Sequence, residues 1–155
     1  FLLYSHCLLC CMLSFVKDKL NPFHLAIPVS NLKESVIYYR DILGLEEGRS
    51  SNKWADFNFF GHQLVCHVSD SINDNITNPV DGESVPVPHF GVVLSIEEFE
   101  AFLLKINEKD IDFIIEPTIR FKGEIGEQRT MFFRDPSGNA IEIKAFKDIE
   151  NLFSS

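Results

Sequence analysis

The stretch that decides the fold is Asp135-Pro136-Ser137-Gly138-Asn139-Ala140-Ile141-Glu142-Ile143-Lys144. Its first half predicts a turn, because Pro136 fixes φ, Gly138 supplies positive φ, and an Asp or Asn side chain can bond the backbone. Its second half predicts a strand in which the two isoleucines face one way while Glu142 and Lys144 face the other. A glutamate in mid-strand among apolar neighbours requires either a wet face or a positive partner.

The first half of the chain predicts a strand, a helix, a second strand and a hairpin, in that order. The opening strand spans 22–29, and the helix begins at the N-cap Asn31 and ends before Gly44. A short strand over 45–49 and a hairpin over 54–68 follow, with alternating apolar and polar residues in the hairpin.

The second half of the chain repeats this order. A strand over 89–94 leads into a helix that Ser95 and Glu98 open as a capping box. A strand over 111–116, a charged loop over 117–128 and the hairpin around the opening stretch complete the repeat. Each repeat alone would leave one sheet face bare, so we expect the two to pair.

The predicted fold class is therefore α+β, with two βαβββ modules pairing into a curved mixed sheet cup whose convex face carries the helices. Strand parity directs His24, His89 and Glu142 into that cup. The expected organisation begins with a leader over residues 1–21 that is suspected to be stray sequence outside the native protein. A first module over 22–70, a polar linker over 71–87, a second module over 88–147 and a tail over 148–155 follow.

Composition restricts the classes of partner. The net charge is −9 and no basic run occurs, which argues against nucleic acid and against anionic membranes. The apolar start of the leader is too short to span a bilayer and lacks the basic end of a signal peptide. Cys66 is the one cysteine outside the leader, so we expect no intrachain disulfide and a cytoplasmic location.

Four motifs resemble the vicinal oxygen chelate superfamily, which holds glyoxalase I, extradiol dioxygenases, fosfomycin-resistance enzymes and bleomycin-binding proteins. They are Phe23-His24-Leu25-Ala26-Ile27, Tyr38-Tyr39-Arg40-Asp41-Ile42-Leu43-Gly44, Pro88-His89-Phe90-Gly91-Val92 and Asp135-Pro136-Ser137-Gly138-Asn139 followed by Glu142. The resemblance covers roughly residues 22–147 and is nearest to small dioxygenases of the extradiol type. It implies a small-molecule substrate and a homodimer.

The resemblance also implies a divalent metal held by His24, His89 and Glu142. Two imidazoles and one carboxylate leave adjacent positions open on an octahedral ion, which suits Fe(II) binding a chelating substrate together with O₂. Zn²⁺, Mn²⁺ and Ni²⁺ accept the same ligands. The alternative is a wet groove in which each histidine is simply hydrogen-bonded.

The residues around the cup supply further candidates. Residues 61–68 contain no Glu or Asp, so the fourth carboxylate of glyoxalase I relatives is missing, and His67 is the candidate acid–base group; a solvated strand histidine is the alternative. The candidates for contacts with the substrate are Asp56, Asn58, Gln63, Arg120, Lys122 and Lys144. For Arg120 and Lys122, the alternative is a solvated surface loop.

The most specific function predicted from the sequence is a metal-dependent dioxygenase that cleaves a catechol-like molecule. A glyoxalase- or epimerase-type enzyme, in which a metal stabilises an enediolate, is the first alternative. A metal-free protein that sequesters an antibiotic, like the bleomycin-resistance proteins, is the second. Metal content separates the last from the others, and oxygen uptake separates the first two.

Overall fold

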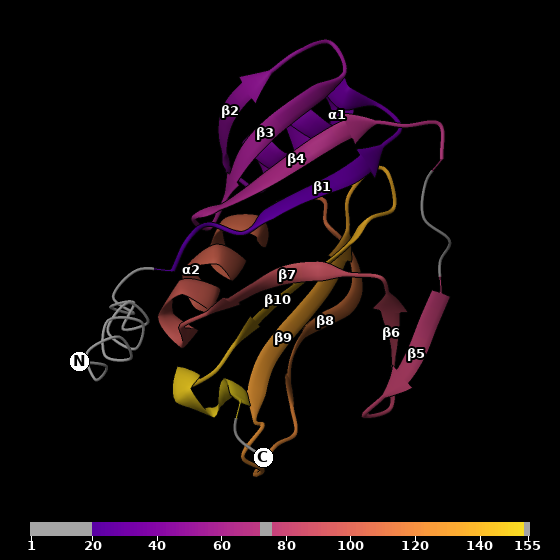
Figure 1. The fold of residues 1–155 in the computed structure, drawn as a ribbon. Coiled ribbons are helices and arrows are strands. Elements are labelled where there is room, and N and C mark those ends of the chain that lie inside the picture. Colours follow the sequence, from indigo (N-terminus) through magenta and orange to yellow (C-terminus); the bar gives the residue numbers. More distant parts are fainter. Residues whose placement is uncertain (1–19, 72–75, 154–155) are drawn as a thin grey trace, which may run out of the picture.

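The computed structural model describes residues 20–71 and 76–153, so the expected leader lies outside it except for residues 20 and 21. The fold is α+β, with two βαβββ modules and mixed sheets, as the sequence predicts (Figure 1). None of the helices in these described ranges is long and apolar enough to cross a membrane.

The first module forms one four-stranded sheet. Its elements are β1 (His24–Val29), α1 (Leu32–Val36), the π-helical segment η1 (Ile37–Ile42), β2 (Glu46–Ser50), β3 (Trp54–Phe59) and β4 (His62–Val68). The strand order is β1-β4-β3-β2, with β1 parallel to β4 and the other pairs antiparallel. The predicted helix limits are confirmed: the Asn31 side chain accepts from the amides of Lys33 and Glu34, and Gly44 stops the helix with φ 68°.

The second module repeats this arrangement. Its elements are β7 (Phe90–Leu94), α2 (Ile96–Ile106), β8 (Asp112–Arg120), β9 (Gln128–Arg134), β10 (Ala140–Ala145) and the 3₁₀ turn η2 (Ile149–Phe153). The strand order is β7-β10-β9-β8, with β7 parallel to β10. The capping box of Ser95 and Glu98 is confirmed by both of its hydrogen bonds.

One predicted boundary in this module was wrong. The charged loop expected to begin at Pro117 begins only after Arg120, because β8 continues to that residue. Pro117 is tolerated since β8 is the edge strand of its sheet, and the pairing with β9 is irregular between Ile115 and Thr118. Arg120 is consequently a strand residue and not a loop residue.

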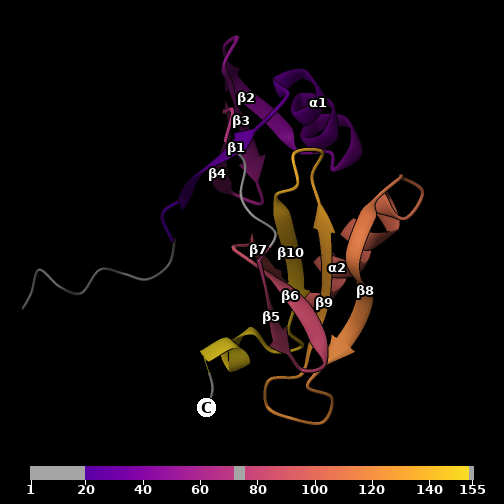
Figure 2. The same cartoon turned by 90° about the vertical axis from the view of Figure 1, so that its right-hand side faces the viewer.

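The segment expected to be a plain linker carries a hairpin of its own. Strands β5 (Ile76–Val80) and β6 (Glu83–Val87) pair antiparallel as a separate two-stranded sheet. Asp81 and Gly82 both have positive φ, 51° and 80°, which is the geometry of a tight two-residue hairpin turn. Figures 1 and 2 show this hairpin standing beside the sheet of the second module.

The two modules share one hydrophobic core. Alternate residues of β1 and β10 enter it, among them Ile27, Val29, Ile141 and Ile143, together with side chains from η1 and α2. The intervening residues of the same strands, including the two predicted ligands on them, are absent from that core. Both ligand-bearing sheet faces are therefore turned away from the shared core, and no strand pairing joins the two sheets within the described residues.

The β9–β10 turn is the main polar connection between the modules. Figure 2 shows it at the end of its sheet nearest α1 and β1. The Asn139 amide group donates to the Pro28 carbonyl at 2.8 Å, and the Ser30 backbone N–H donates to Ser137 Oγ at 3.0 Å. Inside the turn, Asp135 Oδ1 accepts from the backbone N–H groups of Ser137 and Asn139. The turn predicted from Asp135-Pro136-Ser137-Gly138-Asn139 is thus present, and it docks on the other module.

Candidate metal centre

His89 and Glu142 form the core of the candidate site. His89 directly precedes β7, Glu142 lies in β10, and these two strands are hydrogen-bonded neighbours. His89 Nε2 lies 3.4 Å from Glu142 Oε2, and 31% of the histidine side chain is exposed against 6% of the glutamate side chain. A nearly buried carboxylate therefore meets an imidazole that solvent and ligands can reach.

The imidazole is held by a partner on its other nitrogen. His89 Nδ1 lies 2.7 Å from the Pro86 carbonyl oxygen, which can only accept, so Nδ1 carries a proton. Nε2 is then the nitrogen available to a proton or a cation on the side of Glu142. Histidines that ligate metals are commonly oriented in this way by a carbonyl on the second nitrogen.

Glu142 is surrounded by groups that favour its charged form. Thr130 Oγ1 donates to Oε1 at 2.9 Å, and Lys144 Nζ lies 3.1 Å from Oε2. Burial alone would raise the pKa of Glu142, but His89, Lys144 and Thr130 outweigh burial and the pKa lies below its ordinary value. The hydrogen bond to Glu142 raises the pKa of His89 against the opposing effect of burial.

Sequence reasoning missed Thr130 and Pro86. Thr130 could have been predicted from the sequence, because counting back from the turn pairs Lys144 with Thr130 and Glu142 with Phe132 in the β9–β10 ladder. The alternation of that ladder places Thr130 on the face of Glu142. Pro86 gave no comparable signal, since its carbonyl acts through backbone geometry that no residue type indicates.

His24 lies in the other module and has its own polar partners. Its Nδ1 is 2.7 Å from Gln63 Oε1, and Gln63 Nε2 donates to Asp56 Oδ2 at 3.1 Å. Arg49 completes the chain at 3.4 Å from the same Asp56 oxygen. Because Gln63 Oε1 accepts from Nδ1, the Nε2 atom of this exposed histidine is left for another partner.

The remaining first-module candidates, His67 and Asn58, differ in whether they share the sheet face of His24 or form a local hydrogen bond. His67 is exposed on β4 and pairs in register with Pro28, which places it on the same sheet face as His24 by strand parity. Asn58 instead has a local role, because its Oδ1 accepts from the Gly61 backbone N–H at 2.7 Å across the β3–β4 turn.

The two basic candidates near the end of β8, Arg120 and Lys122, differ in their exposure to solvent. Arg120 is 5% exposed, and its Nη2 donates to the Val80 carbonyl at 2.7 Å. Lys122 is exposed in the loop after β8. Lys144 is thus the predicted basic residue that directly contacts the His89–Glu142 pair.

The structure does not bring all three predicted ligands together within one chain. His89 and Glu142 meet, whereas His24 belongs to the sheet of the other module. Across residues 20–71 and 76–153, no group of three or more His, Cys, Asp or Glu side chains is arranged to hold a metal ion. The outward orientation of both ligand-bearing faces explains this separation.

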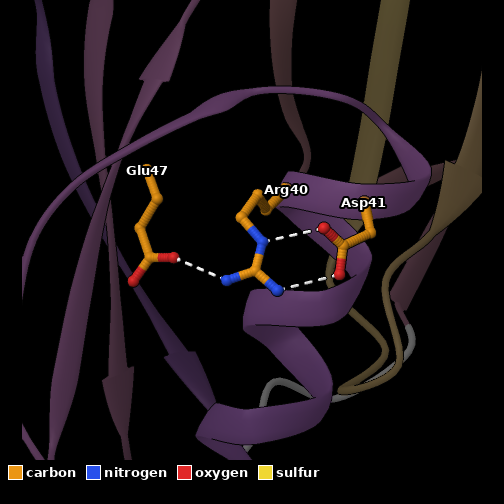
Figure 3. A network of polar contacts seen from close by, with 3 residues as sticks. All are labelled: Arg40, Asp41 and Glu47. Atoms are coloured by element: carbon orange, nitrogen blue, oxygen red, sulfur yellow. Dashed lines mark hydrogen bonds and ion pairs between the residues drawn. The ribbon is translucent and has the colours of Figure 1, made fainter.

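A groove of about 690 Å³ lies elsewhere, between α1 and β2. Arg40 and Glu47 line it, and Figure 3 shows Arg40 bridging Asp41 and Glu47. These ion pairs are exposed, so they contribute little beyond fixing η1 to β2. The groove contains none of the predicted site residues, and its side chains offer no ligand set for a metal.

Comparison with known proteins agrees with the architecture. The chain is 28% identical over 123 residues to the metallothiol transferase FosB of Staphylococcus epidermidis, covering 77% of this chain and 79% of that protein. A crystal structure of a glyoxalase/bleomycin resistance protein/dioxygenase from Alicyclobacillus acidocaldarius superposes with a TM-score of 0.75 and 32% identity, covering 85% of this chain and 96% of that one.

More distant structures share the fold. The fosfomycin resistance protein FosX from Listeria monocytogenes superposes with a TM-score of 0.63 at 20% identity, covering 83% of this chain and 93% of that one. The model of the Glyoxalase/Bleomycin resistance protein/Dioxygenase superfamily matches residues 21–143, which include the first module, the second module as far as the middle of β10, and all three predicted ligands. The chain therefore belongs to this superfamily, the vicinal oxygen chelate superfamily that its motifs resemble.

Proposed function

We propose that the protein is a divalent-metal-dependent enzyme acting on a small oxygen-rich molecule, with His24, His89 and Glu142 as its metal ligands. The observation that carries the proposal is the His89–Glu142 pair, with Nε2 and Oε2 at 3.4 Å. The Nε2 lone pair of the imidazole and the carboxylate oxygen are both metal donors, so a divalent cation can replace the proton that the two atoms share.

The surrounding residues fit a metal ion. The Pro86 carbonyl orients His89, and the Thr130 hydroxyl orients Glu142, so both ligands have the outer hydrogen bonds typical of metal sites. A bound divalent ion would act as a Lewis acid that polarises a substrate oxygen. Lys144 contacts the same Glu142 oxygen, and its ammonium would be released to meet a negative charge on the substrate.

The third ligand is proposed to come from a second copy of the chain. His24 is exposed and its Nδ1 is already bonded to Gln63, so Nε2 is free to bind. The ligand-bearing faces of both sheets point away from the shared core, and the exposed His24 and the partly exposed His89 can be reached by a partner. A two-fold dimer would place the His24 face of each chain against the His89–Glu142 face of the other and form two equivalent sites.

Among superfamily activities, we favour transfer of a thiol to a small electrophile. Support comes from the similarity to proteins named metallothiol transferase FosB, which extends over 77% of the chain. The geometry is compatible with this activity, because Lys144 places a positive charge beside the proposed metal ligands. That charge would attract an anionic substrate such as fosfomycin.

The dioxygenase predicted from the sequence is the second candidate, with Fe(II) as metal and O₂ as co-substrate. The observation that favours it is His67, which shares a sheet face with His24 and is exposed to solvent. A neutral imidazole there could take a proton from a catechol and return it. Loss of oxygen uptake in His67→Phe with retention of metal would support this candidate.

Metal binding tests the proposal first. Purified metal-free protein should bind Mn²⁺ or Co²⁺ in calorimetry, and His89→Ala and Glu142→Gln should each abolish tight binding while retaining the far-ultraviolet circular dichroism spectrum. A matched control is His62→Ala, which removes a histidine at the start of β4, where its ring accepts from the Phe23 backbone N–H. A wild-type protein that binds no divalent ion would refute the enzyme and favour the metal-free antibiotic binder.

Substrate class is tested on the loaded protein. We expect Mn²⁺-loaded protein to consume a thiol in the presence of fosfomycin. The Fe(II)-loaded protein is assayed in parallel for oxygen uptake with catechols and for isomerisation of a hemithioacetal. Oxygen uptake without thiol consumption would select the dioxygenase, and hemithioacetal isomerisation alone would select the glyoxalase-type alternative.

A further inference from the structure

The β5–β6 hairpin packs on the same face of the second sheet that carries Glu142. Val85 of the hairpin is buried against Ile115 of β8 and Phe132 of β9, and together they form a small apolar cluster separate from the shared core. Phe132 pairs in register with Glu142, so this cluster borders the candidate metal site. The hairpin is therefore one wall of the site.

The same hairpin ends directly beside a proposed ligand. Pro86 lies in β6, and its carbonyl holds His89 Nδ1 at 2.7 Å. The His89 ring also contacts Phe132 edge-on, with ring centroids 5.2 Å apart. The position of His89 consequently depends on where β6 lies relative to β9.

Arg120 fastens the opposite end of the hairpin. Its Nη2 donates to the Val80 carbonyl at 2.7 Å, and its Nε lies 3.7 Å from Asp81 Oδ2 in the turn. The guanidinium lies over the Phe121 ring at 5.2 Å, and the side chain is 6% exposed. Nε is buried without a hydrogen-bond partner, so within the described residues this buried group relies on the Val80 carbonyl as its hydrogen-bond acceptor.

We propose that Arg120 is a positioning residue for the metal centre, because it clasps the tip of the β5–β6 hairpin and the hairpin holds His89 with Nε2 toward Glu142. This inference rests on the proposed function, since it assigns Arg120 a part in the same site. The recorded contacts of Arg120 are with Val80, Asp81 and Phe121, and none of the three proposed ligands is among them. Arg120 acts through Val80, the apolar packing of Val85, and the Pro86 carbonyl.

The β5–β6 hairpin depends on Arg120 for its position, and the site depends on the hairpin. A two-stranded hairpin is marginal on its own in water and depends on its contacts with the rest of the fold. The hairpin is held to the second module by one small apolar cluster, by Arg120 and by the Pro86–His89 hydrogen bond. Removing the arginine should let the hairpin open locally, and an opened hairpin would leave the His89 ring free to turn away from Glu142.

The test compares Arg120→Met with wild type. The methionine keeps an apolar stem of similar length and removes every donor. In the metal-free protein, amide hydrogen exchange of residues 76–87 should accelerate at least about tenfold, while exchange in β1 and β4 stays unchanged. Co²⁺ affinity should fall about 10- to 100-fold, the usual effect of removing a group that orients a metal ligand. Arg120→Lys should restore part of both losses, because it keeps one charged donor.

Arg129→Met is the matched control. Arg129 is also in the second sheet and pairs with Glu100 on α2, away from the hairpin. Its buried Nε likewise has no hydrogen-bond partner among the described residues. This variant should lose stability without changing hairpin exchange or Co²⁺ affinity. Failure of wild type to bind Co²⁺ would overturn the proposed function and this inference with it. Normal wild-type binding with unchanged exchange or unchanged affinity in Arg120→Met would overturn this inference alone.

Discussion

Tyr39 and Asp135 join the two modules through one buried hydrogen bond. The Tyr39 hydroxyl donates to Asp135 Oδ2 at 2.9 Å, and the two residues are 0% and 4% exposed. The same carboxylate organises the β9–β10 turn through its other oxygen. A single aspartate thus fixes both the shape of the turn and the place where it docks.

Tyr39→Phe should lower the free energy of unfolding by about 1.5–3 kcal/mol, the range for a hydrogen bond to a charged group. Tyr38→Phe provides the comparison, because the Tyr38 hydroxyl donates to the neutral Arg134 carbonyl at 2.8 Å. Its loss should be smaller, about 0.5–1.5 kcal/mol. Urea unfolding followed by circular dichroism measures both, and equal losses would contradict the special role of Asp135.

Stability should decline at alkaline pH because three buried acids resist ionisation. Burial is the main cause that raises the pKa of Cys66, Tyr38 and Tyr39, and Asp135 adds to it in each case. Above the ordinary pKa of each group the unfolded chain loses protons that the folded chain keeps, so the stability fully present at lower pH is lost as pH rises.

The decline should begin near pH 8.5 for the thiol and steepen near pH 10 for the phenols, by up to about 1.4 kcal/mol per pH unit for each group. Unfolding curves recorded from about pH 7 to about pH 11 measure this decline, because the range covers the ordinary pKa values of a thiol and a phenol. Cys66→Ala should remove the earlier phase only. A flat profile across that range would be incompatible with neutral, buried side chains at these positions.

A mixing experiment tests the origin of the third ligand. His24→Ala and Glu142→Ala should each bind metal poorly alone. If His24 reaches the site of a second copy, a mixed dimer contains one site with all three native ligands, so an exchanged mixture should recover roughly a quarter of the wild-type sites. Calorimetry with Mn²⁺ counts them. No recovery after verified subunit exchange would mean that His24 is not supplied by the partner.

Gly91→Ala should damage the site although it replaces none of the proposed ligands. A Cβ at this position would overlap the backbone carbonyl of Glu142, because Gly91 and Glu142 face each other in the β7–β10 ladder. We expect β7 to move away from β10, with a lower melting temperature and weaker metal binding. Gly126→Ala is the control, since a Cβ there meets nothing within 4 Å and the backbone is not left-handed.

The sequence predicted the repeated modules because apolar periodicity, caps and turn residues all act locally. Asn31, Ser95 and Gly138 behave as their residue types indicate, and strand parity correctly separates Glu142 from its isoleucine neighbours. Local patterns carry less information where strands contain proline. The Asp81-Gly82 turn was a readable hairpin signal, but Pro79 and Pro86 within the strands favoured a linker instead.

The relation between the modules could not be read from such patterns. Parity places His24 and Glu142 on particular faces of their sheets, but it does not say which faces meet. That choice depends on contacts far apart in the sequence, such as the Asn139 side chain on the Pro28 carbonyl and the Phe59 ring near the Phe90 ring. The outward orientation of both ligand faces follows from these contacts.

The shared core also determines when during synthesis the chain can fold. The first module is complete in sequence at Val68, yet the carboxylate acceptor for the Tyr39 hydroxyl arrives only with Asp135 and much of the packing on η1 and β3 only with β9 and β10. A nascent chain that ends before this turn would expose a large apolar surface on its first module. Folding of the first module should therefore wait for β9 and β10, which makes the nascent chain that ends before their turn the species that most needs protection by chaperones.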